Sequence, residues 1–133
     1  MSAPLEDIVV IDLSRALAGP HAAMMLGDMG ARVVKVETPG TGDDTRDWGP
    51  PFVGPDGRTS TYFLCANRNK ESIELDLKSQ DGKDVLTALV RHGDVLIENY
   101  RPGVAEDIGI GYDALSEMND RLIYLSISAF GPH

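Results

Sequence analysis

The chain has 133 residues, a length that fits one domain. Its 21 acidic and 12 basic residues give a net charge of −9. This balance argues against general binding to nucleic acids or anionic membranes, because both attract basic surfaces. The lone Cys65 excludes an intramolecular disulfide, and no apolar run approaches the roughly 20 residues of a membrane-spanning helix. With no visible signal peptide, we expect a soluble cytoplasmic protein.

The first part of the chain has the pattern of a strand, a helix and a second strand. Residues 8–13 are a β-branched apolar run, typical of a strand buried on both faces. Pro20 suits the first position of a helix that continues to residue 29, and Gly30 is placed to end it. Residues 31–37 return to strand composition. The unit predicts two parallel strands joined by a right-handed crossover.

A long segment rich in proline and glycine follows, over residues 38–59, and a loop of that length is usually functional. Residues 60–64 fit either a short helix or a strand. A helix that begins at Asp81 or Gly82 and ends near Gly93 carries an apolar face of Val85, Leu86, Leu89 and Val90. Further strands are predicted at 72–77, 94–98 and 122–128, and further short helices at 103–109 and 112–118. The alternation predicts an α/β fold, with a mostly parallel sheet and flanking helices.

Parallel sheets of this kind bind ligands beyond the carboxyl ends of their strands, which directs attention to loops 14–20, 38–59 and 99–103. Residues 18–20 precede a helix N-terminus, where backbone N–H groups favour an anion, although a plain tight turn fits equally well. Residues 98–103 place polar, aromatic and cationic side chains after a buried strand, which favours ligand contact over a structural role.

Several other residues invite a functional interpretation. The cations Arg68 and Lys70 could bind phosphate oxygens, and a solvated turn explains them as well. Asp43 and Asp44 are interpreted as capping and solvated residues rather than a metal or acid–base pair. Trp48 is expected to anchor its loop by packing.

The motifs of several common active sites are missing. The three histidines, His21, His92 and His133, are too scattered for a metal site, and Cys65 is expected to be an inert buried thiol. The sequence has no G-x-G-x-x-G, no P-loop motif and no G-x-S-x-G, which argues against dinucleotide oxidoreductases, P-loop enzymes and serine hydrolases.

Seven segments, in order along nearly the whole chain, resemble class III CoA-transferases, the family of formyl-CoA and carnitine CoA-transferases. The matching strings are PLEDI with DLSR and LAGP, LGDMGA with VKVE, GDDTR, WGPPF, NRNK with LDLK, DVLIENYRPG, and SISAFGP. The chain is particularly similar to the branch that moves CoA between dicarboxylic acids such as succinate, glutarate and hydroxymethylglutarate.

The resemblance implies that residues 1–133 form a CoA-binding, Rossmann-like N-terminal domain, incomplete and without its second domain. Such proteins are two-domain interlocked homodimers that transfer CoA from an acyl-CoA to a small carboxylic acid, without a metal. A carboxylate attacks the thioester and later carries CoA as an aspartyl thioester. In relatives this aspartate follows the Gly-Pro of the last matching segment, so no catalytic residue is assigned in this chain.

The resemblance also implies contacts to CoA. Leu17 and Ala18 match a loop near the thioester. Two further stretches match residues along CoA: Leu75, Asp76, Leu77 and Lys78, and then Asn99, Tyr100 and Arg101.

Two departures concern the phosphate groups of CoA. Thr38 and Asp107 stand where formyl-CoA transferase has arginines that contact CoA, and an aspartate near a phosphate would repel it. We expect Arg101, Arg68 or Lys70 to supply the missing charge, or the loop to be arranged differently.

Two alternatives stay open. The α-methylacyl-CoA racemases share the fold and much of the pattern, but they typically have a shorter segment in place of residues 38–59, which favours a transferase. The chain could also be a CoA-binding module without catalysis.

Overall fold

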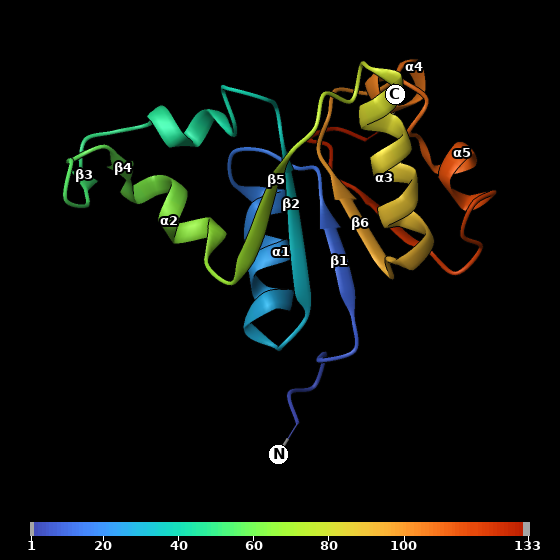
Figure 1. The fold of residues 1–133 in the computed structure, drawn as a ribbon, viewed down its shortest axis with the longest axis horizontal. Helices are drawn as coiled ribbons and strands as arrows, with labels where there is room; N and C mark the ends of the chain where they lie inside the picture. The colour runs from blue at the N-terminus through green and yellow to red at the C-terminus, as the bar shows by residue number, and fades with distance from the viewer. Residues whose placement is uncertain (1, 132–133) are drawn as a thin grey trace.

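The computed structural model describes residues 2–131, so Pro132 of the last matching segment and His133 lie outside the described residues. Its centre is a five-stranded sheet in the order β5-β2-β1-β6-β7, and every neighbouring pair is parallel (Figure 1). The strands are β1 (Val9–Asp12), β2 (Arg32–Glu37), β5 (Lys70–Glu74), β6 (Val95–Glu98) and β7 (Ile123–Ser126). The predicted α/β fold with a mostly parallel sheet is confirmed.

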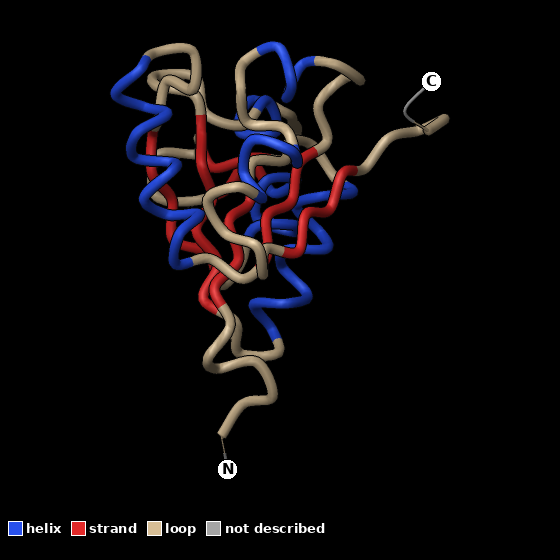
Figure 2. Tube along the Cα trace, turned by 90° about the vertical axis from the view of Figure 1, so that its right-hand side faces the viewer, coloured by secondary structure: helices blue, strands red, loops and turns tan. Residues whose placement is uncertain are grey.

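Helices cover both faces of the sheet, and the strands lie between them when the molecule is turned by 90° (Figure 2). One face packs against α1 (Ala18–Asp28), and the other against α3 (Gln80–His92), α4 (Val104–Asp107) and α5 (Tyr112–Ser116). Adjacent residues of β1 serve opposite cores: Val10 packs with the α1 side and Ile11 with the α3 side, and both are fully buried. The strand is therefore buried on both faces, as its continuous apolar run predicts.

The strand order reverses direction at β1. The chain passes from β1 to β2 and β5 on one side, and then crosses to β6 and β7 on the other. Because the loops after the strands run in opposite directions at this point, a crevice forms between them beyond the carboxyl ends of the strands. Ligands of such sheets bind there. The loops after β1 and β6 touch there: the Arg15 N–H donates to Asn99 Oδ1 (2.8 Å), and Asn99 Nδ2 donates to the Arg15 carbonyl (2.8 Å).

Helix α1 begins earlier than its proline predicts. It starts at Ala18, so Pro20 occupies the third helical position rather than the first. The position is tolerated because N–H groups throughout the first turn have no partner within the helix. Gly30, with φ of +102°, follows the helix in the left-handed region and ends it as predicted.

Helix α3 differs from expectation at its start and on one side of its apolar face. Ser79 caps it by accepting a hydrogen bond from the Gly82 N–H (3.0 Å), so the helix begins at Gln80. Leu86 and Val90 are buried as predicted, but Val85 is 45% exposed. Val85 lies about 100° around the helix from Leu86, at the margin of the apolar arc, where the sheet no longer covers it.

Strand β5 begins two residues and ends three residues earlier than predicted. It ends earlier because residues 75–77 leave the sheet after the Leu75 N–H donates to the Glu37 carbonyl (2.9 Å). The open choice at residues 60–64 resolves as a helix, α2 (Thr61–Asn67). Ser60 caps it by accepting from the Phe63 N–H (3.2 Å).

Residues 38–60 form an ordered excursion that projects, with α2, to one side of the sheet (Figure 1). It contains a 3₁₀ turn, η1 (Asp44–Asp47), and a two-stranded antiparallel ribbon of β3 (Phe52–Val53) and β4 (Thr59–Ser60). No helix among residues 2–131 is long and apolar enough to cross a membrane.

Glu37, the last residue of β2, holds this excursion to the sheet. Its buried carboxylate accepts from the Asp43 N–H (2.8 Å), from Arg46 Nε (2.7 Å) and Nη2 (2.6 Å), and from Ser72 Oγ (2.5 Å). Arg46 also lies over the ring of Phe63, 3.9 Å from its centroid. Burial alone would raise the pKa of Glu37, but the hydrogen bonds from Arg46, Ser72 and the Asp43 N–H outweigh it and lower the pKa to about 2.

Candidate functional site

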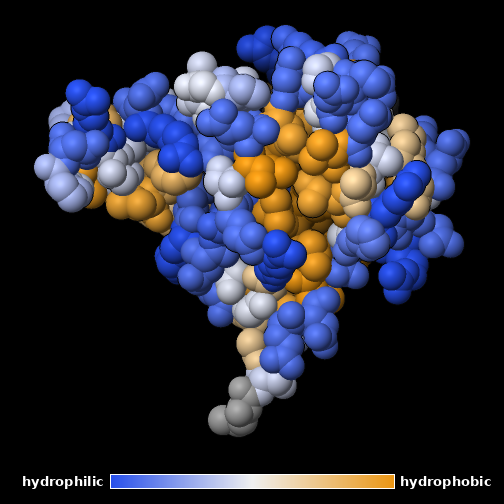
Figure 3. Space-filling view, in the orientation of Figure 1, coloured by the Kyte–Doolittle hydropathy of each residue, from blue (hydrophilic) through white to orange (hydrophobic). Residues whose placement is uncertain are grey.

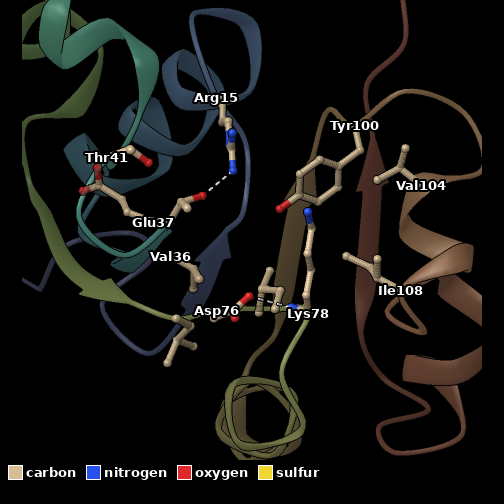
Figure 4. A pocket seen from close by; sticks show the side chains of 12 residues that line it. Arg15, Val36, Glu37, Thr41, Asp76, Lys78, Tyr100, Val104 and Ile108 are labelled. Carbon is tan, nitrogen blue, oxygen red and sulfur yellow. Dashed lines mark hydrogen bonds between the residues drawn. The ribbon is translucent and has the colours of Figure 1, made fainter.

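A cavity of about 460 Å³ lies at the carboxyl edge of the sheet (Figure 4). Segments that follow four neighbouring strands, β5, β2, β1 and β6, reach it together with α4. The residues that line it are Arg15, Val36, Glu37, Thr38, Thr41, Leu75, Asp76, Leu77, Lys78, Tyr100, Val104 and Ile108. The cavity therefore occupies the position that the reversal of strand order predicts for a ligand.

Apolar side chains make up one wall of the cavity. Leu75 and Leu77 point into the core on the α3 side, while the alternating Asp76 and Lys78 are exposed. Figure 3 shows apolar surface gathered over β2 and β1 beside α3, with hydrophilic surface on either side. A volume of this size, with an apolar wall beside polar groups, is within the range of small-molecule sites.

Polar groups reach the cavity from opposite sides. Arg15 points into it from the loop after β1, while Lys78 extends across it toward Tyr100 (Figure 4). Burial raises the pKa of the Tyr100 phenol, which therefore keeps its proton and can donate a hydrogen bond. The Asp76 side chain is engaged by its own turn, since Oδ1 accepts from the Lys78 N–H (3.0 Å).

A cluster of buried charges supports the loop that carries Arg15. Asp12 Oδ2 accepts from Lys70 Nζ (2.9 Å) and lies 3.9 Å from Lys35 Nζ. Lys35 Nζ also pairs with Asp43 Oδ2 (2.9 Å) and donates to the Ser14 carbonyl (2.9 Å). The side chains of Asp12, Lys35 and Lys70 are at most 2% exposed. Two cations and two carboxylates that are all buried compensate each other, so the cluster is structural support.

This cluster corrects the interpretation of residues 67–70. Lys70 is available neither to a phosphate nor to solvent, because its ammonium donates to Asp12, to the Pro20 carbonyl (2.8 Å) and to Asn67 Oδ1 (2.9 Å). Burial lowers the pKa of Lys70, while Asp12 opposes the shift. Arg68 pairs with Asp28 (2.6 Å) at the far end of α1. Neither residue supplies a charge to the cavity.

The predicted CoA-contacting residues separate into two groups. Leu75, Asp76, Leu77, Lys78 and Tyr100 line the cavity. Their contact with CoA stays a prediction.

The other predicted residues lie elsewhere. Asn99 uses its amide to bind the Arg15 backbone, and with Arg101 it lines a neighbouring groove of about 400 Å³. Leu17 and Ala18 are exposed at the N-terminus of α1 and do not line the cavity. Their proximity to a thioester also stays a prediction.

The two departures from the family pattern have different outcomes. Thr38 lines the cavity, where its Oγ1 accepts from Arg15 Nη2 (2.5 Å). Asp107 is the exposed last residue of α4, whereas Val104 at the start of this helix and Ile108 just after its end line the cavity. The repulsion expected between Asp107 and a phosphate is therefore not built into this cavity.

The structure can be compared with the predictions for four further residues. Trp48 packs edge to face against Tyr62, with ring centroids 5.1 Å apart, as a loop anchor would. Asp43 caps η1 through the Thr45 N–H (3.0 Å) as predicted, but it is buried and ion-paired rather than solvated. Asp44 is exposed. The prediction that Cys65 is buried is wrong, because it lies on the outer face of the short helix α2.

Sequence reasoning missed Arg15. The signal for it is positional: a cation stands three residues after the last residue of a buried strand, in the loop at which the strand order reverses. Only the strand order shows that this loop faces the segments after β2 and β5. Within the described chain, no group of three or more His, Cys, Asp or Glu side chains is placed to hold a metal ion.

Comparison with known proteins shows the family of the chain. The pattern of CoA-transferase family III matches residues 5–133. The chain is 50% identical to human succinyl-CoA:glutarate CoA-transferase over 128 residues, which is 96% of this chain and 28% of that protein. It is also 50% identical to succinate–glutarate CoA-transferase of Agrobacterium fabrum over 131 residues, covering 96% of this chain and 33% of that protein.

A solved structure agrees with these matches. A CaiB/BaiF family protein from Brucella suis superimposes with a TM-score of 0.94 at 43% identity, covering all of this chain and 35% of that one. The chain thus spans about a third of the length of the relatives it matches. On the match over nearly its whole length, the chain belongs to CoA-transferase family III.

Proposed function

We propose that this chain forms the CoA-binding part of an enzyme that moves CoA from an acyl-CoA to a small carboxylic acid. The observation that carries the proposal is the cavity at the reversal of strand order, where an apolar wall meets the cations Arg15 and Lys78. CoA combines a long neutral arm with phosphate groups, and it needs both kinds of surface. Two relatives are named as CoA-transferases that act on succinate and glutarate, and these names favour dicarboxylic acids as substrates.

The cavity does not suit the alternative of a dinucleotide cofactor. Dinucleotide-binding proteins of this topology use an acidic residue after the second strand to bind the ribose hydroxyls. Glu37 has that place, but both of its oxygens accept hydrogen bonds from Arg46, Ser72 and the Asp43 N–H. A ribose would have to displace Arg46 from the buried Glu37 carboxylate. The absence of G-x-G-x-x-G points the same way.

The proposed chemistry divides one difficult exchange into easier steps. An enzyme aspartate attacks the thioester carbonyl, and CoA leaves as a thiolate, which produces a mixed anhydride. The thiolate then attacks the aspartyl carbonyl, so the donor acid leaves and CoA stays as an aspartyl thioester. The acceptor carboxylate repeats these steps in reverse. We assign the aspartate to the part of the relatives' length that this chain does not match. We further propose that the complete enzyme is a cytoplasmic homodimer.

Two measurements on the complete protein that carries this sequence test the proposal. Calorimetry should show CoA binding in the micromolar to millimolar range, and succinyl-CoA with glutarate should yield glutaryl-CoA by liquid chromatography. Absence of CoA binding at millimolar ligand would contradict the proposal. Deuterium exchange at the α-carbon of an acyl-CoA without transfer would favour a racemase. Binding without either reaction would favour a module without catalysis.

A further inference from the structure

We propose that Arg15 is the residue that binds a phosphate group of CoA in this cavity, with Thr38 holding its guanidinium in position. The inference rests on the proposed function and adds to it the contact that recognises the nucleotide end of the ligand. Arg15 is the one arginine among the residues that line the cavity of the described chain. Figure 4 shows it pointing into the cavity from the loop after β1.

The charge of Arg15 has no carboxylate partner within residues 2–131. Its side chain donates one hydrogen bond, from Nη2 to the neutral Thr38 hydroxyl (2.5 Å). A guanidinium has five N–H donors in a planar fork that matches phosphate oxygens. The acidic neighbour Glu37 is already neutralised by Arg46 (2.6 Å). A partly buried guanidinium with spare donors and no anion is the state expected of a phosphate-binding residue before its ligand arrives.

The other cations near the carboxyl edge are committed elsewhere or poorly suited. Lys35 and Lys70 are buried in ion pairs with Asp43 and Asp12. Lys78 also lines the cavity, but its residue is exposed, and its flexible ammonium lacks the planar fork of donors that a guanidinium offers to phosphate oxygens. Arg15 is therefore the group with both the charge and the geometry.

The backbone of Arg15 is fixed before any ligand binds. Its N–H and carbonyl both bond to the Asn99 amide (2.8 Å each). The next residue, Ala16, has a φ of +64°, and its N–H donates to Asp43 Oδ1 (3.3 Å). A loop that is already ordered before the ligand arrives lowers the entropic cost of binding. These contacts use backbone atoms, so a substitution that changes only the Arg15 side chain leaves them in place.

The decisive variant is Arg15→Met in the complete protein, which keeps the aliphatic length and removes the charge. Hydrogen bonds to charged groups contribute about 1.5–3 kcal/mol, so we expect CoA affinity to fall roughly 10- to 100-fold. The value of kcat/KM should fall by a similar factor with succinyl-CoA and stay unchanged with succinyl-pantetheine, which lacks every phosphate. The control Arg91→Met, on the exposed last turn of α3, should change none of these values.

Dephospho-CoA shows which phosphate is bound. Equal losses for CoA and dephospho-CoA assign the diphosphate, whereas a loss for CoA alone assigns the 3′-phosphate, and both support the proposal. An Arg15→Met protein that binds CoA like the unmodified protein overturns it. Equal losses with succinyl-CoA and succinyl-pantetheine also overturn it, since the effect would then be on the fold. If the unmodified protein binds no CoA, the proposed function fails, and this inference fails with it.

Thr38→Val keeps the test decisive if Arg15→Met does not fold, and a double variant adds a test of charge. Thr38→Val removes the acceptor that positions the guanidinium, and a several-fold loss of CoA affinity is expected from one lost hydrogen bond. An unchanged affinity would contradict the role of Thr38. Because the two side chains meet at 2.5 Å, an arginine at position 38 can replace the lost charge. The double variant R15M/T38R should recover most of the affinity, and a failure to recover would contradict a role based on charge.

Discussion

The ion pair at the end of β2 allows a stability prediction with a defined pH dependence. Glu37→Gln keeps the size of the side chain and removes its charge, which leaves Arg46 without a partner. The pKa of Glu37 falls from an ordinary 4.5 to about 2 in the folded protein. Each unit of pKa difference corresponds to about 1.4 kcal/mol, so the ionised Glu37 carboxylate contributes about 3 kcal/mol to the free energy of unfolding at pH 7. Because the Arg46 side chain is 42% exposed, water screens part of this, and we expect about 2 kcal/mol.

The sign of the pH dependence follows from the lowered pKa. A carboxyl group whose pKa is depressed by folding stabilises the protein fully above its unfolded pKa. The contribution of Glu37 should therefore be complete above about pH 4.5 and disappear as the pH falls toward 2. The difference in the free energy of unfolding between the original protein and Glu37→Gln should narrow across the same window.

Urea denaturation at pH 7, 5, 4 and 3 measures this difference. A matched control is Glu71→Gln, which breaks an ion pair with Arg32 on the same half of the sheet. The side chains of that pair are 62% and 59% exposed, so its removal should cost less than about 1 kcal/mol. A Glu37→Gln effect no larger than that of the control, or one that stays constant from pH 7 to pH 3, would refute the reasoning.

Two further substitutions test the support of the cavity. Asp12→Asn leaves Lys35 and Lys70 as buried cations with too little negative charge, and we expect a loss of about 3–5 kcal/mol in unfolding free energy by denaturant titration. A loss below about 1 kcal/mol would show that the cluster is not dry. Gly82→Ala places a methyl group against the Asp76 carbonyl, so it should lower both the melting temperature and CoA affinity despite the better helix propensity of alanine. A higher melting temperature with unchanged affinity would contradict that contact.

Local features of the chain were predictable where local physics decides them. The β-branched run of β1 predicts a strand buried on both faces, and Val10 and Ile11 are fully buried in opposite cores. Gly30 ends α1 because a residue with positive φ is needed there and glycine adopts it without strain. Five of the nine residues assigned by family resemblance, including Tyr100, line the cavity, and their contact with CoA stays a prediction.

Charged residues were the least predictable. Lys35 and Lys70 have sequence neighbours typical of a strand and a polar turn, and nothing local indicates that Asp12 and Asp43 meet them out of water. Burial of a lysine depends on whether a carboxylate from a distant segment arrives to compensate it. That information is contained in the register of the strands, since Lys35 of β2 is paired with Asp12 of the neighbouring strand β1.

By itself, the sequence determined the class of fold, the approximate extents of its larger elements and the family to which it belongs. The tertiary structure decided which cations line the cavity. Arg15, Thr38, Lys78 and Tyr100 are spread over 86 positions of the chain, and they meet because the order β5-β2-β1-β6 brings four strand ends to one edge. Hydrophobic periodicity is a property of neighbours along the chain, whereas a binding site depends on distances between segments that only the folded sheet brings together.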